Sequence, residues 1–138
     1  MPIDTFKQLL EDHSSDLFAF AQELIQTPSL SGAEGKLAEK LVKKLPELGY
    51  EQIEVDAAGN LLAIIPGTQS AVPSPLFLSH LDHCEPGTLE DWSYAPYSAK
   101  IQSPYILGCG ASDSKGAMAA QMYAGYLLKK LYPELPIS

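Results

Sequence analysis

The sequence predicts an α/β fold, and its 138 residues fit a single domain. Apolar residues recur at helical spacing in two N-terminal segments, over about 4–26 and 37–48. Apolar or alternating runs of strand length follow at 53–65 and 76–79. A glycine-rich turn then leads into a third helical pattern at about 114–131. Helices mixed with short strands in this way are typical of an α/β architecture.

Local signals set the expected ends of the first two helices. Thr27-Pro28 ends the first helix, because the residue before a proline avoids helical backbone angles. Ser31 followed by Glu34 fits a capping box for the second helix. Gly49 supplies its stop, and Pro46 disturbs its last turn.

Two strand regions are expected between the second helix and the third. In residues 53–65, alternating apolar and acidic positions, a turn at Gly59-Asn60 and an apolar run predict a β-hairpin. The run 76–79 predicts a buried strand that ends by presenting His80. Residues 86–104 predict a packed irregular loop, and the helix at 114–131 is apolar enough to be buried.

Composition and charge narrow the function classes. The net charge of −8 excludes nucleic acid and anionic membranes as expected partners, because both attract Lys and Arg. No apolar run is long enough to span a membrane. The N-terminus shows no export signal, so a cytoplasmic location is expected. The two cysteines, Cys84 and Cys109, are expected to be free and buried.

His80 and Asp82 form the first candidate metal site. Residues two apart in an extended segment point the same way, so the imidazole and the carboxylate can share one pocket. Zinc binds imidazole nitrogen, and a ligating histidine commonly needs a carboxylate to fix its tautomer. Asp113 strengthens the prediction, because it lies where the turn containing Gly108 and Gly110 enters a helix.

Other interpretations of these residues stay open at this point. His80 and Asp82 also fit a surface pair at the end of a strand, and Asp113 also fits a plain helix N-cap. A third possibility is a mononuclear metal site made of His80, His83 and Cys84.

Several motifs in register carry a resemblance to a known family. They are Ser79-His80-Leu81-Asp82-His83, Pro86-Gly87, Trp92, Pro96, Ile101 and the run Gly108-Cys109-Gly110-Ala111-Ser112-Asp113-Ser114-Lys115-Gly116. In order and spacing, residues from about 22 to 131 resemble the N-terminal part of the family of acetylornithine deacetylase, succinyl-diaminopimelate desuccinylase and carboxypeptidase G. The members of this family are zinc-dependent exopeptidases and amidohydrolases.

The resemblance implies a role for each candidate residue. His80 looks like the terminal ligand of one zinc ion, Asp113 like the carboxylate that bridges two zinc ions, and Asp82 like the catalytic acid that orients the imidazole. Cobalt or manganese can occupy similar ligands. The family pattern also implies a cis peptide bond at Asp113-Ser114. The chain departs from the family at Cys109, where an arginine is usual.

The resemblance also implies that residues 1–138 are only part of a catalytic domain. The implied fold is an α/β/α sandwich with a mixed sheet, like that of zinc exopeptidases. The family's general base, remaining metal ligands and lid or dimerisation domain have no counterpart in this sequence. We therefore expect an inactive fragment of a larger dizinc hydrolase, which would cleave amide bonds of N-acyl amino acids or short peptides and could be a homodimer. The alternative is a truncated, non-catalytic relative that binds metal weakly or serves as an interaction module.

Overall fold

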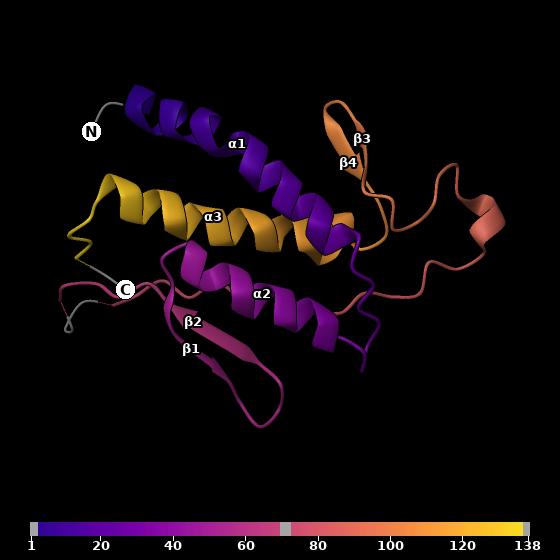
Figure 1. Cartoon of the computed structure of the whole chain (residues 1–138), viewed down its shortest axis with the longest axis horizontal. Helices are drawn as coiled ribbons and strands as arrows, with labels where there is room; N and C mark the ends of the chain where they lie inside the picture. The colour runs from indigo at the N-terminus through magenta and orange to yellow at the C-terminus, as the bar shows by residue number, and fades with distance from the viewer. Residues whose placement is uncertain (1–2, 70–72, 137–138) are drawn as a thin grey trace.

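The computed structural model describes residues 3–69 and 73–136. It contains three long helices, α1 (Ile3–Ile25), α2 (Gly35–Glu47) and α3 (Gly116–Leu131). Two antiparallel hairpins lie between α2 and α3: β1 (Glu51–Val55) pairs with β2 (Leu61–Ile64), and β3 (Lys100–Gln102) pairs with β4 (Tyr105–Leu107). Figure 1 shows α1, α3 and α2 arranged side by side, with the β1–β2 hairpin beyond α2. The predicted α/β character is confirmed as a mixed fold with small antiparallel sheets.

One apolar core joins the three helices. Its members share a face of each helix, and they are Phe20, Ala21, Leu24, Leu37, Leu41, Leu45, Leu48, Met118, Ala119, Met122 and Tyr123. The leucines of α2 recur every four residues or close to it, so one stripe of that helix enters the core. The predicted burial of α3 is confirmed by Met118, Met122 and Leu127.

The predicted start of the second helix is wrong, although its end is right. The N-cap position of α2 is Glu34, and it makes no side-chain capping bond. Ser31 lies too far before Gly35 to reach the first turn, and its hydroxyl instead donates to Oδ2 of Asp82. Gly49 ends the helix as predicted, with a φ of +75° that glycine adopts without strain.

The predicted hairpin at 53–65 is confirmed as β1–β2. Val55 pairs with Leu61 and Glu54 with Leu62. The turn between them is closed by Asp56, whose Oδ1 accepts hydrogen bonds from the backbone N–H groups of Ala58 and Asn60. Such a carboxylate replaces backbone partners in a tight turn.

The predicted buried strand at 76–79 is not found. These residues have no strand assignment, and the side chains of Leu76 and Leu78 are 81% and 79% exposed. The physical reason is the lack of a partner: each sheet in the described part of the chain has two strands, and neither sheet includes this segment. An apolar run of strand length becomes a buried strand only where a neighbouring strand pairs with it.

The remaining expectations have mixed outcomes. The loop at 86–104 is packed around Trp92, Tyr94 and Tyr97, which are partly buried, whereas residues 87–91 are exposed and Lys100–Gln102 form strand β3. The cysteines are free as predicted, but Cys84 is exposed and Cys109 half-buried, because both border an open pocket. Over residues 3–69 and 73–136, no helix is long and apolar enough to cross a membrane.

Candidate metal site

A buried polar network holds Leu81 and His83, the two residues on either side of Asp82. The backbone N–H of Ser29 donates to Nε2 of His83 at 3.0 Å, and the backbone N–H of His83 donates to the Ser29 carbonyl, also at 3.0 Å. The Ser29 hydroxyl donates to the carbonyl of Leu81. Ser29 and His83 are both buried, so these bonds are shielded from competing water. The network fixes the path of residues 81–83 relative to the end of α1.

His80, Asp82 and Asp113 come together at one place. Nε2 of His80 lies 2.6 Å from Oδ1 of Asp113, although 33 residues separate them. Nδ1 of the same ring lies 3.1 Å from Oδ1 of Asp82 and 2.9 Å from the Asp82 carbonyl. The ring is half exposed, and the Asp113 side chain is 87% exposed. The structure therefore brings all three predicted site residues together at the surface.

The contacts change the proton affinities of these groups. The hydrogen bond with Asp113, followed by the bond to the Asp82 backbone, raises the pKa of His80 above its usual value. The Ser31 hydroxyl and then His80 lower the pKa of Asp82. Asp82 is thereby kept as a carboxylate that can orient the imidazole.

Asp113 lies in an irregular helical turn, Ala111–Lys115, that leads into α3. Its own backbone angles are not helical (φ −133°, ψ 94°), and the peptide bond to Ser114 is cis, as the resemblance implies. The N-cap interpretation of Asp113 is wrong, because the N-cap of α3 is Lys115 and carries no side-chain cap bond. The Asp113 carboxylate faces His80 instead.

The two glycines before Asp113 allow close packing, as their pattern suggested. A Cβ on Gly108 would collide with the Ile25 side chain. Gly110 has a φ of +76° and packs against the ring of His83. Both positions therefore exclude a side chain or strain one.

The mononuclear site of His80, His83 and Cys84 is wrong. Both ring nitrogens of His83 are already bonded, Nε2 to the Ser29 N–H and Nδ1 to the Cys84 carbonyl at 2.7 Å. The Nε2 lone pair of His83 already accepts the Ser29 N–H, and its Nδ1–H is donated to the Cys84 carbonyl, so the ring has no lone pair left for a metal. The ring is also buried beneath the surface on which His80 lies.

Lys115 is a further buried polar residue beside the site. It is fully buried, and its Nζ donates to the Thr27 carbonyl at 2.6 Å. Burial lowers the pKa of Lys115 to about 8. This bond ties the start of α3 to the loop that follows α1, and so connects Asp113 to the buried network around Ser29.

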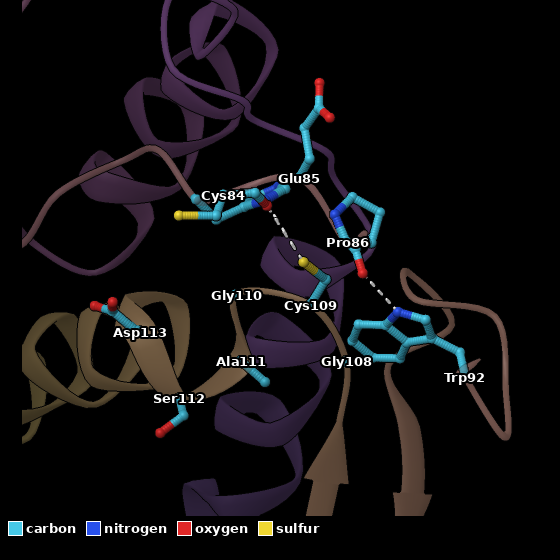
Figure 2. Close-up of a pocket in the computed structure, with 11 residues that line it drawn as sticks. Cys84, Glu85, Pro86, Trp92, Gly108, Cys109, Gly110, Ala111, Ser112 and Asp113 are labelled. Atoms are coloured by element: carbon cyan, nitrogen blue, oxygen red, sulfur yellow. Dashed lines mark hydrogen bonds between the residues drawn. The ribbon is translucent and has the colours of Figure 1, made fainter. Parts of the chain in front are cut away.

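A pocket of about 310 Å³ borders Asp113. Figure 2 shows Asp113 at one side of it and Trp92 at the other. The Trp92 Nε1–H donates to the Pro86 carbonyl, and the Cys109 thiol contacts the Cys84 carbonyl at 3.6 Å. Asp113 and Trp92 thus border the same pocket from opposite sides.

The donor set fits part of a zinc site. Imidazole nitrogen and carboxylate oxygen are both zinc ligands, and the second nitrogen of His80 has the carboxylate partner that ligating histidines commonly have. A catalytic zinc takes three protein ligands, however, and the described residues contain no group of three or more His, Cys, Asp or Glu placed to hold a metal. His80 and Asp113 are therefore two candidate ligands, fewer than a catalytic zinc takes.

Ser31 is the site residue that the sequence did not reveal. Its hydroxyl lies 2.5 Å from Oδ2 of Asp82, from a loop 51 residues earlier. The only signal was its place in a Ser-Gly-rich loop after the first helix, and the same signal fitted a helix cap.

Comparison with known proteins finds relatives over most of the chain. No family model matches it. It is 30% identical over 129 residues to YgeY of Escherichia coli strain K12, a protein named as uncharacterized, with 91% of this chain and 31% of YgeY aligned. It is 34% identical over 122 residues to the succinyl-diaminopimelate desuccinylase of Blochmanniella pennsylvanica, with 86% of this chain and 32% of the enzyme aligned. For the enzyme of the same name from Pelagibacter ubique, the identity is 32% and the aligned shares are 75% and 28%. The chain spans about a third of the length of these relatives.

Proposed function

Because the chain belongs to the family that includes the succinyl-diaminopimelate desuccinylases, we propose that it is the N-terminal part of the catalytic domain of a zinc-dependent amide hydrolase. The complete domain would be an α/β/α sandwich with a mixed sheet. Residues 1–138 alone would be inactive, because two ligands are fewer than a catalytic zinc requires.

One observation carries the proposal. His80 and Asp113 are far apart in the chain, yet Nε2 of His80 lies 2.6 Å from Oδ1 of Asp113. A random surface pair would not also have its second ring nitrogen on a carboxylate, whereas His80 has Asp82 there. A nitrogen and an oxygen converging at an exposed point, with the ring orientation fixed from behind, are what a zinc site requires.

Each residue has a proposed role. His80 would bind one zinc ion through Nε2, and Asp113 would bridge two zinc ions. Asp82 would orient the imidazole, with its own carboxylate held by the Ser31 hydroxyl. Bound zinc supplies an activated water near neutral pH and polarises the substrate carbonyl. The buried bond from Lys115 to Thr27 ties the residues just after Asp113 to the loop that follows α1.

The proposed substrates are N-acyl amino acids or short peptides, which enter the pocket beside Asp113. Support comes from the names of the relatives, since a desuccinylase removes an acyl group from an amine. The homodimer and the cytoplasmic location stay predictions for the complete protein.

Zinc calorimetry on the 138-residue chain tests the proposal. We expect Zn²⁺ to bind, and we expect His80→Ala and Asp113→Asn each to weaken it at least about tenfold, because each removes one of two ligands. His13→Ala is the matched control, since His13 contacts the ring of Tyr126 away from the site. Absence of zinc binding, or affinity that survives both substitutions, would overturn the proposal and favour a non-catalytic relative. Co²⁺ and Mn²⁺ titrations would identify the preferred metal.

A further inference from the structure

The segment that delivers His80 lacks the usual means of support. Residues 76–79 pair with no strand in the described part of the chain. Their apolar side chains are not packed, since Leu76, Phe77 and Leu78 are all more than half exposed. His80 nevertheless lies within hydrogen-bond distance of Asp113. Some other contact has to fix the end of this segment.

The contacts that fix it come from α3 and the turn before it. Oε1 of Gln121 accepts a hydrogen bond from the Ser79 hydroxyl at 2.5 Å. Nε2 of the same side chain lies 3.4 Å from the Leu78 carbonyl and donates to it. Ser114 adds a bond from its hydroxyl to the His80 carbonyl at 2.8 Å. Leu78, Ser79 and His80 are thus each hydrogen-bonded to α3 or to the turn before it.

Gln121 is suited to this task by position and by chemistry. It lies in α3, whereas Ser114 lies in the irregular turn before α3, and the two side chains bond neighbouring residues of the same segment. Its neighbour Met122 enters the core, so the base of the Gln121 side chain is anchored. An amide carries both a donor and an acceptor, and Gln121 uses each on a different residue.

We propose that Gln121 is a positioning residue of the metal site: its side-chain amide holds Leu78 and Ser79 against α3 and so places His80 opposite Asp113. The inference rests on the proposed function for the meaning of that placement. The placement itself can be measured without metal.

The first measurement is backbone ¹⁵N relaxation on the metal-free chain. Gln121→Leu and Ser79→Ala remove the bond between these two residues from opposite sides, and Ser79 is exposed, so its substitution leaves the core intact. We expect both variants to make the amides of residues 78–80 mobile while α3 stays ordered. Gln121→Glu keeps an acceptor for Ser79 and should retain most of the order at that residue. Gln8→Leu is the control, because Gln8 bonds only Asp12 on α1.

The second measurement is zinc affinity in the same variants. Loss of one hydrogen bond that places a ligand should weaken binding about threefold to tenfold in Gln121→Leu and Ser79→Ala. Gln8→Leu should bind like the original chain. Order at residues 78–80 that survives both Gln121→Leu and Ser79→Ala would overturn the positioning role, whether or not zinc binds. Failure of the original chain to bind zinc would instead overturn the proposed function, and the relaxation data would still decide the role of Gln121.

Discussion

His80 is held between two carboxylates, and a hydroxyl holds one of them. Ser31 donates to Asp82, Asp82 contacts Nδ1 of His80, and Nε2 of His80 contacts Asp113. A chain of polar contacts fixes the ring plane more strongly than one contact could, because each group restrains its neighbour. The orientation of His80 therefore depends on residues from three separate segments.

The Ser31 hydroxyl is predicted to control the charge of Asp82. Ser31→Ala removes the hydroxyl that lowers the Asp82 pKa most, so that pKa should rise towards its ordinary value. Titration of the Asp82 side-chain carboxyl by ¹³C NMR measures the change. Ser14→Ala is the control, because the Ser14 hydroxyl bonds only the Glu11 carbonyl. An Asp82 titration curve that is the same in both variants would show that the Ser31 contact does not act in solution.

Lys115 is predicted to make stability increase with pH. Burial lowers its pKa in the folded chain to about 8, whereas the unfolded chain keeps the ordinary value of 10.5. Between these values the unfolded chain binds a proton that the folded chain lacks, so raising the pH favours folding. Below pH 8 the penalty for burying the charge is fully present.

Urea unfolding measures this effect. The free energy of unfolding should rise by about 2 kcal/mol from about pH 7.5 to about pH 9.5, relative to the Lys115→Met variant, from which this titration is absent. An equal rise in both proteins would assign the pH dependence to other groups.

The sequence predicted three candidate site residues that the structure brings together, but it did not predict the residues that hold them. His80, Asp82 and Asp113 could be predicted because each follows a recognisable local pattern and the order of motifs matches a family. The predicted helix cap at Ser31 and the possible metal ligand at His83 were wrong, because both side chains bond residues more than 50 positions away. A local pattern cannot encode such contacts.

Helix α3 contacts the core, the turn that contains Asp113 and the segment that contains His80. One face enters the core, its start follows Asp113, and Gln121 reaches the His80 segment. At Gly125 the ring of Tyr50 packs closely against α3, and the Tyr50 hydroxyl donates to the Met122 carbonyl. This contact joins the β1 end of the molecule to the helix that carries the site.

Two helical glycines are predicted to respond in opposite ways to alanine. A Cβ at Gly125 would collide with the Tyr50 hydroxyl and Ile65, so Gly125→Ala should destabilise the chain by about 1–3 kcal/mol. Gly35 has open space around it, so Gly35→Ala should be neutral or stabilise α2 by up to about 1 kcal/mol. Thermal or urea unfolding of both variants measures the difference. Equal effects would contradict the packing of Tyr50 on α3.

A mutation in the segment 76–79 can distinguish the exposed segment of the structure from the buried strand that the sequence pattern predicts. Phe77→Ser should change the free energy of unfolding by no more than about 0.5 kcal/mol, because the side chain is exposed. Leu24→Ala, at a fully buried core position, should cost about 2–5 kcal/mol. A cost for Phe77→Ser that approaches the cost for Leu24→Ala would mean that the segment is a buried strand after all.

Sequence periodicity correctly predicted the elements whose signals lie within their own sequence. The three helices and the β1–β2 hairpin have apolar stripes or turn residues within their own sequence. The segment 76–79 has a strand's composition, but whether it becomes a strand is decided by a pairing partner elsewhere. The capping box failed for a similar reason, because Asp82 is a competing partner for Ser31.

The whole molecule is a helical core with two small hairpins attached. It spans about a third of the length of its relatives, and it brings two candidate metal ligands, His80 and Asp113, together. The proposed hydrolase thus depends on whether His80 and Asp113 act together.

Imidazole ¹⁵N NMR during a zinc titration tests that dependence most directly. The chain has three histidines, so each ring can be assigned and followed separately. We predict that zinc shifts Nε2 of His80, leaves the rings of His13 and His83 unchanged, and loses this effect in Asp113→Asn. A zinc-induced shift at His83 or His13, or a His80 shift that persists in Asp113→Asn, would contradict the account.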